Sequence, residues 1–309
     1  MPYALEYEGI SKQYRSLFGR RIILALQNFV LSVHEGEIFG FLGPNGAGKT
    51  TAIHLAMGFM RTTSGAGRML GKPFGDVATR RRVGFLAENV AFYPRSAESV
   101  VRFYGGLNDM HGPALRRAVS DVLQAVGLRS ESGRNISQFS RGMLQRIGLA
   151  QAFVNDPALV ILDEPTSALD PATRVAVREL LLTARRHGKT IFLSSHLLSE
   201  VELVCDRVAI LNRGQVVRTG RLSDLLETGD RIAIVVRSVP AGLFPEATAN
   251  GSWLQFTVAR GQLREALERV WTAGGEVVSV TPLRRSLEDI FLELTAEADS
   301  ASSGGGERG

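Results

Sequence analysis

The stretch that decides the fold is Gly43-Pro44-Asn45-Gly46-Ala47-Gly48-Lys49-Thr50. An apolar run over residues 37–42, expected as a strand, comes before it, and a helix is expected from Thr51. This is the complete phosphate-loop pattern in the strand–loop–helix context that it requires. Glycines let backbone N–H groups approach phosphate closely, and the following helix adds its positive N-terminal end. The stretch therefore predicts that these residues, together with Thr51, bind the phosphates of a nucleotide.

Two residues of this loop and two carboxylates further along the chain have specific predicted roles. The ammonium of Lys49 is expected to pair with the β- and γ-phosphates, and the hydroxyl of Thr50 to ligate Mg²⁺. The second element, Leu159-Val160-Ile161-Leu162-Asp163-Glu164, is an apolar strand that ends in two acids. Asp163 suits the Mg²⁺ shell, directly or through water. Glu164 suits polarisation of the attacking water, so the two elements together predict a P-loop NTPase.

The composition is that of a globular protein. The chain has 309 residues, of which 44% are hydrophobic and 22% charged, and its formal net charge is +5. This charge permits contact with an anionic membrane surface but is not by itself a signature of nucleic-acid binding. No apolar run reaches the roughly 18 residues that span a bilayer. The N-terminus shows no secretory signal, and the only cysteine, Cys205, fits a reducing compartment.

Alternating strands and helices predict the main domain. Residues 3–34 are expected to form short strands joined by a polar loop, and apolar residues recur at helical spacing over 115–126. Another helix is expected from Ser140, and buried strands are expected at 159–162 and 191–193. This order is typical of an α/β domain with a mainly parallel sheet. We assign it to residues 1–228, with a helical subdomain at about 89–155.

A change of composition near residue 228 predicts a second, smaller domain. Strand patterns at 254–258 and 277–280 alternate there with helical patterns at 263–271 and 286–294. This indicates an α+β domain over residues 229–298. The Ser- and Gly-rich end, residues 299–309, is expected to be a disordered tail.

Three further motifs resemble those of ABC ATPases. Phe139-Ser140-Arg141-Gly142-Met143 resembles the signature motif, Ser167-Ala168-Leu169-Asp170 resembles the D-loop, and His196 resembles the switch histidine. Tyr14 is a candidate for stacking on adenine, with Phe18 as the alternative. The motifs follow one another as in that family, and the resemblance covers about residues 3–226. It implies a P-loop NTPase fold of the ABC ATPase type.

In that family two ATP-binding subunits dimerise head to tail around ATP. The resemblance therefore implies a second ATP-binding subunit, expected to be another copy of this chain, with a related chain as the alternative. Asp170 would lie at the dimer interface, and His196 would hold Glu164 and the attacking water in line. Lys49, Glu164 and His196 would be the catalytic residues. The segment that contacts ATP held by the partner, above all through its serine and glycine, would comprise Ser140, Arg141, Gly142 and Met143.

The sequence departs from the common motifs at several positions. Arg141 and Met143 replace the usual glycine and glutamine of the signature motif, and Glu88 stands at the usual Q-loop glutamine. Glu88 could still reach Mg²⁺ or its water. Both variants resemble the exporter branch that includes antibiotic-resistance ATPases, such as those for daunorubicin-type drugs. Residues 286–294 also resemble the end of the C-terminal domain of that branch, which favours export over import.

The resemblance implies partners at a membrane. Membrane-spanning permease subunits, in a separate chain, would dock on apolar surface between Glu88 and Tyr104, and the chain would be peripheral on the cytoplasmic face of the cell membrane. The suitable side chains are Phe92, Tyr93, Phe103 and Tyr104. The alternative is a soluble ABC ATPase that acts on nucleic acid or ribosomes. Such relatives usually carry coiled-coil insertions, zinc modules or two ATPase domains, none of which is recognisable here, so no nucleic-acid partner is expected.

Overall fold

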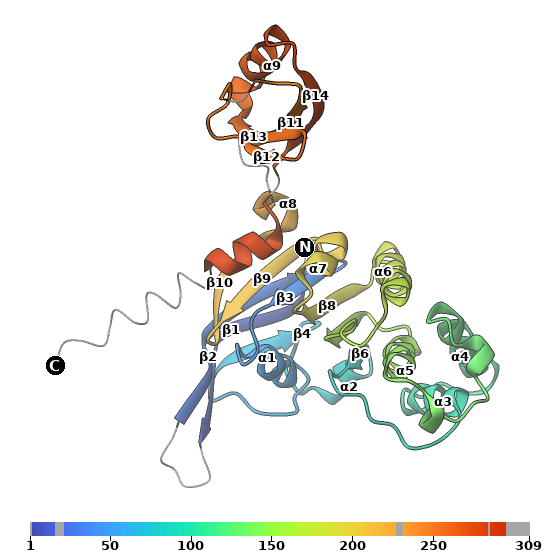
Figure 1. Ribbon diagram of the computed structural model, residues 1–309. Helices are drawn as coiled ribbons and strands as arrows, with labels where there is room; N and C mark the ends of the chain where they lie inside the picture. The colour runs from blue at the N-terminus through green and yellow to red at the C-terminus, as the bar shows by residue number, and fades with distance from the viewer. Residues whose placement is uncertain (1, 16–21, 227–230, 241, 284, 295–309) are drawn as a thin grey trace, which may run out of the picture. The chain divides into compact units, whose positions relative to one another are not determined.

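The computed structural model describes residues 2–15, 22–226, 231–240, 242–283 and 285–294. The chain divides into two compact units, the first formed mainly by Met1–Leu222 and the second by Ser223–Glu293 (Figure 1). The predicted boundary at residues 228 and 229 and the predicted tail lie outside the described residues, as does Phe18. No helix in the described part of the chain is both long and apolar enough to cross a membrane.

A six-stranded sheet forms the centre of the first unit, and it is parallel except at one edge, where β10 runs antiparallel to β9. Every residue of the central strands β3, β7 and β8 is buried, as expected for a parallel sheet covered on both faces. The predicted buried strands are therefore confirmed. In sheet order the strands are β10 (Gln215–Arg221), β9 (Arg207–Asn212), β3 (Ile38–Leu42), β8 (Thr190–Ser195), β7 (Leu159–Asp163) and β6 (Val83–Leu86).

The N-terminal strands are longer than the sequence predicted. β1 (Tyr3–Arg15) and β2 (Ile22–His34) each have 13 residues and pair along their length, with several register shifts. These shifts let long strands bend without breaking, and the alternation pattern alone does not reveal this. With β4 (Ser64–Met69) and β5 (Lys72–Pro73) they form an antiparallel sheet in the order β2-β1-β4-β5.

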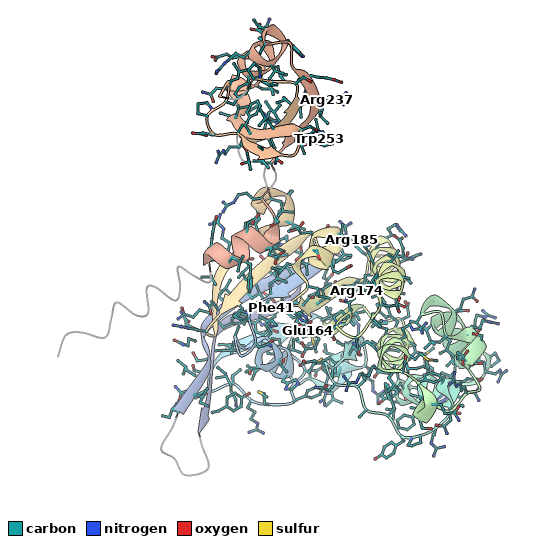
Figure 2. The ribbon with its side chains drawn as sticks, viewed as in Figure 1. Phe41, Glu164, Arg174, Arg185, Arg237 and Trp253 are labelled. Atoms are coloured by element: carbon teal, nitrogen blue, oxygen red, sulfur yellow. The ribbon has the colours of Figure 1, made fainter. Side chains whose placement is uncertain are left out.

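Aromatic side chains join the two sheets of the first unit. The rings of Tyr7 and Phe29 lie 5.0 Å apart, and Phe29 contacts Phe41 of the central sheet at 5.9 Å. Phe41 in turn lies 5.2 Å from Phe192, near the middle of the unit in Figure 2. All four rings are at most 1% exposed. Full burial of each contributes about 1.5–3 kcal/mol, so this core fixes the strands that carry the phosphate loop and the carboxylates.

Some helices of the first unit lie together at one edge of the central sheet. α3, α4 and α5 gather beyond the β6 edge of the sheet (Figure 1), within the predicted helical subdomain. α4 buries Leu115, Val119 and Leu123, and Gly127 follows its end with a φ of 69°, as its sequence predicted. The helices are α1 (Lys49–Ala56), α2 (Val77–Arg80), α3 (Ala97–Leu107), α4 (Gly112–Ala125), α5 (Arg141–Phe153), α6 (Pro171–Arg186) and α7 (Leu198–Val204), with short 3₁₀ turns at Arg129–Glu131 and Ile136–Gln138.

The second unit has an antiparallel sheet in the order β12-β13-β11-β14. Its core joins Ile232, Ile234 and Phe256 to Ala266 and Val270 of a helix. The sequence patterns predicted this helix and the strand of Phe256, but not the strand of Ile232 and Ile234, and Trp271, predicted on the apolar face of the helix, is 59% exposed. Figure 2 labels Arg237 and Trp253 in this unit, and Arg237 forms a bidentate ion pair with Glu276. The elements are α8 (Leu222–Leu225), β11 (Arg231–Arg237), β12 (Thr248–Asn250), β13 (Trp253–Ala259), a 3₁₀ turn at Arg260–Gln262, α9 (Leu263–Thr272) and β14 (Glu276–Pro282), and residues 287–294 are helical.

Candidate functional site

The phosphate loop connects β3 to α1 and requires glycine for steric reasons. A Cβ on Gly43 would lie 2.5 Å from the carbonyl oxygen of Leu211, and one on Gly48 would lie 2.5 Å from that of Ala25. Gly48 also has a φ of 109°, which L side chains rarely adopt. The helix α1 begins at Lys49, two residues before the predicted start. Its first N–H groups have no acceptor within the helix, so this turn provides donors for an anion.

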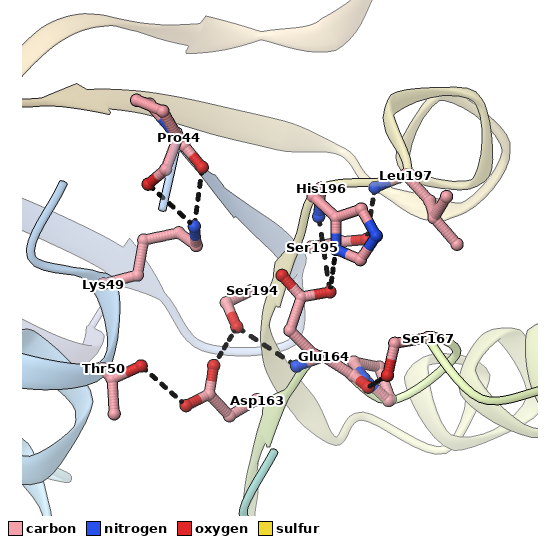
Figure 3. Close-up of polar contacts among 12 residues, drawn as sticks. Pro44, Lys49, Thr50, Asp163, Glu164, Ser167, Ser194, Ser195, His196 and Leu197 are labelled. Carbon is pink, nitrogen blue, oxygen red and sulfur yellow. Dashed lines mark hydrogen bonds and ion pairs between the residues drawn. The ribbon is translucent and has the colours of Figure 1, made fainter. Parts of the chain in front are cut away.

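Lys49 is held over its own loop. Its Nζ donates to the carbonyl oxygens of Gly43 at 2.6 Å and Pro44 at 3.3 Å (Figure 3). The residue is 8% exposed. Burial lowers the pKa of Lys49 below its ordinary value, while the charges of Glu164, Asp163 and Glu88 act in the opposite direction. An anionic ligand placed at this ammonium would relieve the unfavourable burial of its charge.

Two carboxylates from the end of β7 face this loop. Asp163 is 2% exposed, and its Oδ2 accepts a hydrogen bond of 3.1 Å from the Thr50 hydroxyl. Its Oδ1 accepts a hydrogen bond from the Ser194 hydroxyl of β8 (Figure 3). Parallel strands end at the same edge of a sheet, and the loops there form the usual ligand site of open α/β sheets. Residues distant in sequence therefore meet here.

Glu164 pairs with His196 at the same edge. The side-chain Oε2 of Glu164 lies 2.7 Å from Nδ1 of His196 and 3.4 Å from its backbone nitrogen. Glu164 is 7% exposed, and its φ of 52° is unusual for a residue other than glycine. Burial raises the pKa of Glu164 above its ordinary value, and the neighbouring His196 and Lys49 partly oppose this rise. The raised pKa and the fixed partner are features of a catalytic carboxylate.

Comparison with known proteins identifies the family. The ABC transporter family model matches residues 26–167. An ABC transporter ATP-binding protein of Synechocystis, itself uncharacterized, is 37% identical over 301 residues, covering 95% of this chain and 85% of the relative. The chain belongs to the ABC transporter ATP-binding proteins. As a member of this family it is an ABC ATPase, and it binds and hydrolyses ATP.

Two further comparisons concern a bacterial relative and a solved structure. The bacitracin transport ATP-binding protein of Bacillus licheniformis is 32% identical, covering 85% of this chain and 90% of the relative. A dimeric ATP-binding cassette solved in a post-hydrolysis state with ADP and inorganic phosphate matches with a TM-score of 0.65 at 26% identity. That match covers 71% of this chain and 98% of the cassette. The predicted fold class, a P-loop NTPase of ABC ATPase type, is confirmed.

The predicted signature segment lies at the start of α5. Ser140 caps this helix by accepting a hydrogen bond of 3.3 Å from the backbone of Met143, and Ser140 and Arg141 are exposed. A Cβ on Gly142 would lie 3.2 Å from the carbonyl oxygen of Ala168, so the segment adjoins the predicted D-loop of the same chain. Within the described residues, the segment 140–143 forms no hydrogen bond or ion pair with the cluster around Lys49.

The predicted D-loop ends in a helix cap. Asp170 accepts hydrogen bonds from the backbone N–H of Thr173 at 3.0 Å and from its hydroxyl at 2.7 Å, and these bonds lower the pKa of Asp170. Asp170 itself is exposed. Arg174, labelled in Figure 2, holds the loop by donating from Nε to the carbonyl oxygen of Leu169 at 3.1 Å. The loop is thus fixed locally while its acid faces solvent.

Two of the predicted site residues lie at the margin of the cluster. Tyr14 is 38% exposed, and its hydroxyl lies 3.3 Å from that of Thr51, so it reaches the first turn of α1. Glu88 is exposed, and in the described part of the chain it forms no hydrogen bond with Thr50 or Asp163. Glu88 acts on the cluster electrostatically, since its charge opposes the lowering of the Lys49 pKa.

Three residues hold the backbone of Glu164, and sequence reasoning assigned this role to none of them, although Ser167 lies in the predicted D-loop. Ser194 contacts the N–H of Glu164, and Gln145 and Ser167 donate to its carbonyl oxygen, each at 3.2 Å. A serine within the buried strand β8 (Thr190–Ser195) and a glutamine on the buried face of α5 were the available signals. Both are polar residues at positions where burial requires a partner.

Proposed function

We propose that this ABC ATPase powers a membrane exporter by closing and opening as an ATP-dependent dimer. The observation that carries the proposal is the cluster at the edge of the sheet, where Lys49 and Thr50 face Asp163, Glu164 and His196. The γ-phosphate would close the dimer through contacts that ADP lacks, and its loss would let the dimer open.

In this proposal the phosphate loop, Gly43 to Thr51, binds the phosphates of ATP. Lys49 pairs with the β- and γ-phosphates, and Tyr14 stacks on the adenine. Support comes from Thr50, which is exposed in the first turn of α1, and from the hydrogen bond between Tyr14 and Thr51, which brings the ring close to the loop. The charge of the bound phosphates offsets the burial of the Lys49 ammonium.

Thr50 and Asp163 fit Mg²⁺, and we assign them to it. Their side-chain oxygens lie 3.1 Å apart, and the described residues hold no cluster of three or more acids, histidines or cysteines that would bind a metal alone. Mg²⁺ usually takes one or two protein oxygens and completes its shell with phosphates and water. When bound, it would neutralise charge on the β- and γ-phosphates. Glu88 would act from further away, through water.

Glu164 acts as the base that orients the attacking water, and His196 holds Glu164. The 2.7 Å contact between Nδ1 of His196 and Oε2 of Glu164 leaves Oε1 available for the water. The raised pKa makes Glu164 a better proton acceptor than an ordinary surface glutamate. The exchange Glu164→Gln removes the base while keeping the shape, so ATP binding should persist and hydrolysis should nearly vanish.

The signature segment and Asp170 serve the partner subunit. Ser140, Arg141, Gly142 and Met143 lie at the exposed N-terminal end of α5, where a helix favours an anion. They would contact the ATP held by the phosphate loop of the second subunit, which in the simplest case is another copy of this chain. Asp170, exposed at the start of α6, would lie at the interface. This arrangement predicts that the Glu164→Gln variant dimerises when ATP is added, which light scattering can measure.

A hollow on the helical subdomain is the surface we assign to the permease. Its volume is about 840 Å³, and it is lined by residues of 91–104, including Phe92, Tyr93, Phe103 and Tyr104. Tyr93 is 87% and Phe103 60% exposed, and Tyr104 packs edge-on against Phe92 and Phe103. Exposed aromatic surface around a hollow favours an apolar helix as partner. This docking would hold the chain at the cytoplasmic face of the membrane.

Co-purification from gently solubilised membranes of the native host tests the permease assignment. The tagged chain should retain a multi-span membrane protein, and the double exchange Tyr93→Glu and Phe103→Glu should release it. Leu203→Glu, at a leucine of α7 that is 56% exposed, is the matched control and should retain it. Release by the control as well, or recovery with ribosomes or nucleic acid alone, would contradict the assignment.

The proposal of export rests on the exchanged residues Arg141, Met143 and Glu88 and on residues 286–294, which resemble the exporter branch. Export predicts ATP-dependent uptake of a substrate into inside-out membrane vesicles that contain the purified complex. Bacitracin is the first probe because of the bacitracin transport relative. Uptake only into right-side-out vesicles would indicate import instead.

A further inference from the structure

The hydroxyl of Ser194 lies between the two carboxylate residues of the site. Ser194 is on β8, next to β7, and is fully buried. Its Oγ contacts Oδ1 of Asp163 and lies 3.2 Å from the backbone nitrogen of Glu164 (Figure 3). A single side chain outside the recognised motifs therefore contacts both acids.

The chemistry of the three groups fixes the direction of these bonds. A peptide N–H can only donate, and a carboxylate can only accept. The Ser194 hydroxyl therefore donates its one proton to Asp163 and accepts from the N–H of Glu164. Its donor and one of its acceptor positions are both used, so the hydroxyl has little freedom to rotate.

The bond to Asp163 decides which way that carboxylate turns. With Oδ1 held by Ser194, Oδ2 is directed at the Thr50 hydroxyl, 3.1 Å away. This is the oxygen that we assign to Mg²⁺ or its water. Outer-shell partners of this kind hold a ligand in its binding orientation, and losing one typically weakens metal affinity or activity by about 10–100-fold.

The bond to Glu164 supports an unfavourable backbone conformation. A φ of 52° at a residue other than glycine is a strained conformation, which the surrounding structure must offset. The Glu164 N–H donates to both the hydroxyl oxygen and the carbonyl oxygen of Ser194, and each N···O distance is 3.2 Å. Ser194 thereby helps to aim the Glu164 side chain toward His196.

We propose that Ser194 is a positioning residue that sets the metal-side orientation of Asp163 and the backbone of Glu164 together. It acts through these two acids and does not itself touch ATP. The inference rests on the roles proposed for Asp163 and Glu164. It goes beyond them because it makes metal affinity and turnover depend on one buried hydroxyl.

The test compares Ser194→Ala with Ser195→Ala in the full chain. Ser195 is the neighbouring buried serine, 3% exposed; its Oγ accepts from the backbone N–H of Leu197 at 3.0 Å, and in the described part of the chain it forms no hydrogen bond with Asp163 or Glu164. Both exchanges remove one buried hydroxyl from the same strand, so their effects on Tm should be similar. The decisive readout is the affinity for Mn²⁺, used as a probe for Mg²⁺. It is titrated by electron paramagnetic resonance with a non-hydrolysable ATP analogue.

Ser194→Ala should weaken Mn²⁺ binding about tenfold and lower kcat about tenfold, whereas Ser195→Ala should leave Mn²⁺ binding unchanged. Equal Mn²⁺ affinities in the two variants would overturn the inference, whatever their stabilities. The titration can be made in the cold, where a destabilised variant remains folded. Glu164→Gln, measured in parallel, separates the two proposals: full hydrolysis by that variant would refute the role of Glu164 but not the metal-side role of Ser194.

Discussion

Replacing Gln145 by methionine should weaken the connection between α5 and Glu164, the residue that we propose as the base. Gln145 lies on α5, is 3% exposed, and donates from Nε2 to the carbonyl oxygens of Glu164 at 3.2 Å and Pro165 at 3.3 Å. Methionine has nearly the same length and volume, so the exchange removes the hydrogen bonds with little change in packing. The chain segment that carries the base would then be held from one side only.

The magnitude follows from these contacts. The Glu164 carbonyl keeps the hydroxyl of Ser167 at 3.2 Å, so the main loss is at Pro165. A lost buried hydrogen bond costs about 1–2 kcal/mol, within the usual range for an acceptor left without its donor. For a domain of this size that corresponds to a fall of about 2–8 °C in Tm. Since small misplacements of a catalytic group can cost up to about 100-fold in rate, we expect kcat to fall about tenfold.

Gln151→Met is the matched control for this prediction. Gln151 lies on the same helix and donates to the carbonyl oxygen of Phe85 on β6 at 2.8 Å, away from Glu164. Its exchange should lower Tm by a comparable amount and leave kcat within about twofold of the wild type. The assays are differential scanning calorimetry and steady-state hydrolysis of ATP by the full chain. Equal losses of kcat in both variants would refute the argument that Gln145 acts through Glu164.

Three further predictions concern Glu164, Lys49 and Tyr14. Glu164→Gln should raise Tm at neutral pH. At low pH the Glu164 carboxyl is neutral in both the folded and the unfolded state. Because its pKa is raised in the folded state, the wild type loses stability as the pH rises through that pKa. The difference in Tm between variant and wild type should be small near pH 4 and grow toward neutrality, and a difference that is constant with pH would contradict it. Lys49→Met should remove a buried cation and so stabilise the nucleotide-free protein. It should also weaken ATP binding, measured by equilibrium dialysis, by more than about tenfold. A destabilised variant would show that the buried ammonium is not unfavourable. Tyr14→Leu should raise the KM for ATP about five- to tenfold, because it removes a stacking ring that contributes about 1–1.5 kcal/mol. Tyr14→Phe keeps the ring and should keep the KM. Equal effects of the two exchanges would exclude stacking.

The sequence by itself determined the chemistry and the fold class. The phosphate loop needs glycine at Gly43 and Gly48 because neighbouring carbonyl oxygens leave no room for a Cβ, and such a requirement is visible in residue letters. The buried strands at 159–163 and 190–195 were visible as short apolar runs for a similar reason, since a strand covered on both faces has no polar face. Lengths were less visible: β1 and β2 continue through register shifts that interrupt the alternation.

Only the tertiary structure decided how the catalytic residues are held. Asp163 and Ser194 are 31 residues apart in sequence, and Gln145 and Glu164 are 19 apart, yet each pair meets in a hydrogen bond. Their meeting depends on the order of β8 and β7 in the sheet and on the docking of α5, neither of which is encoded by local spacing. A serine in a strand or a glutamine in a helix becomes significant only when its partner is known. The reason is physical: hydrogen bonds are formed over about 3 Å in space, whatever the separation along the chain.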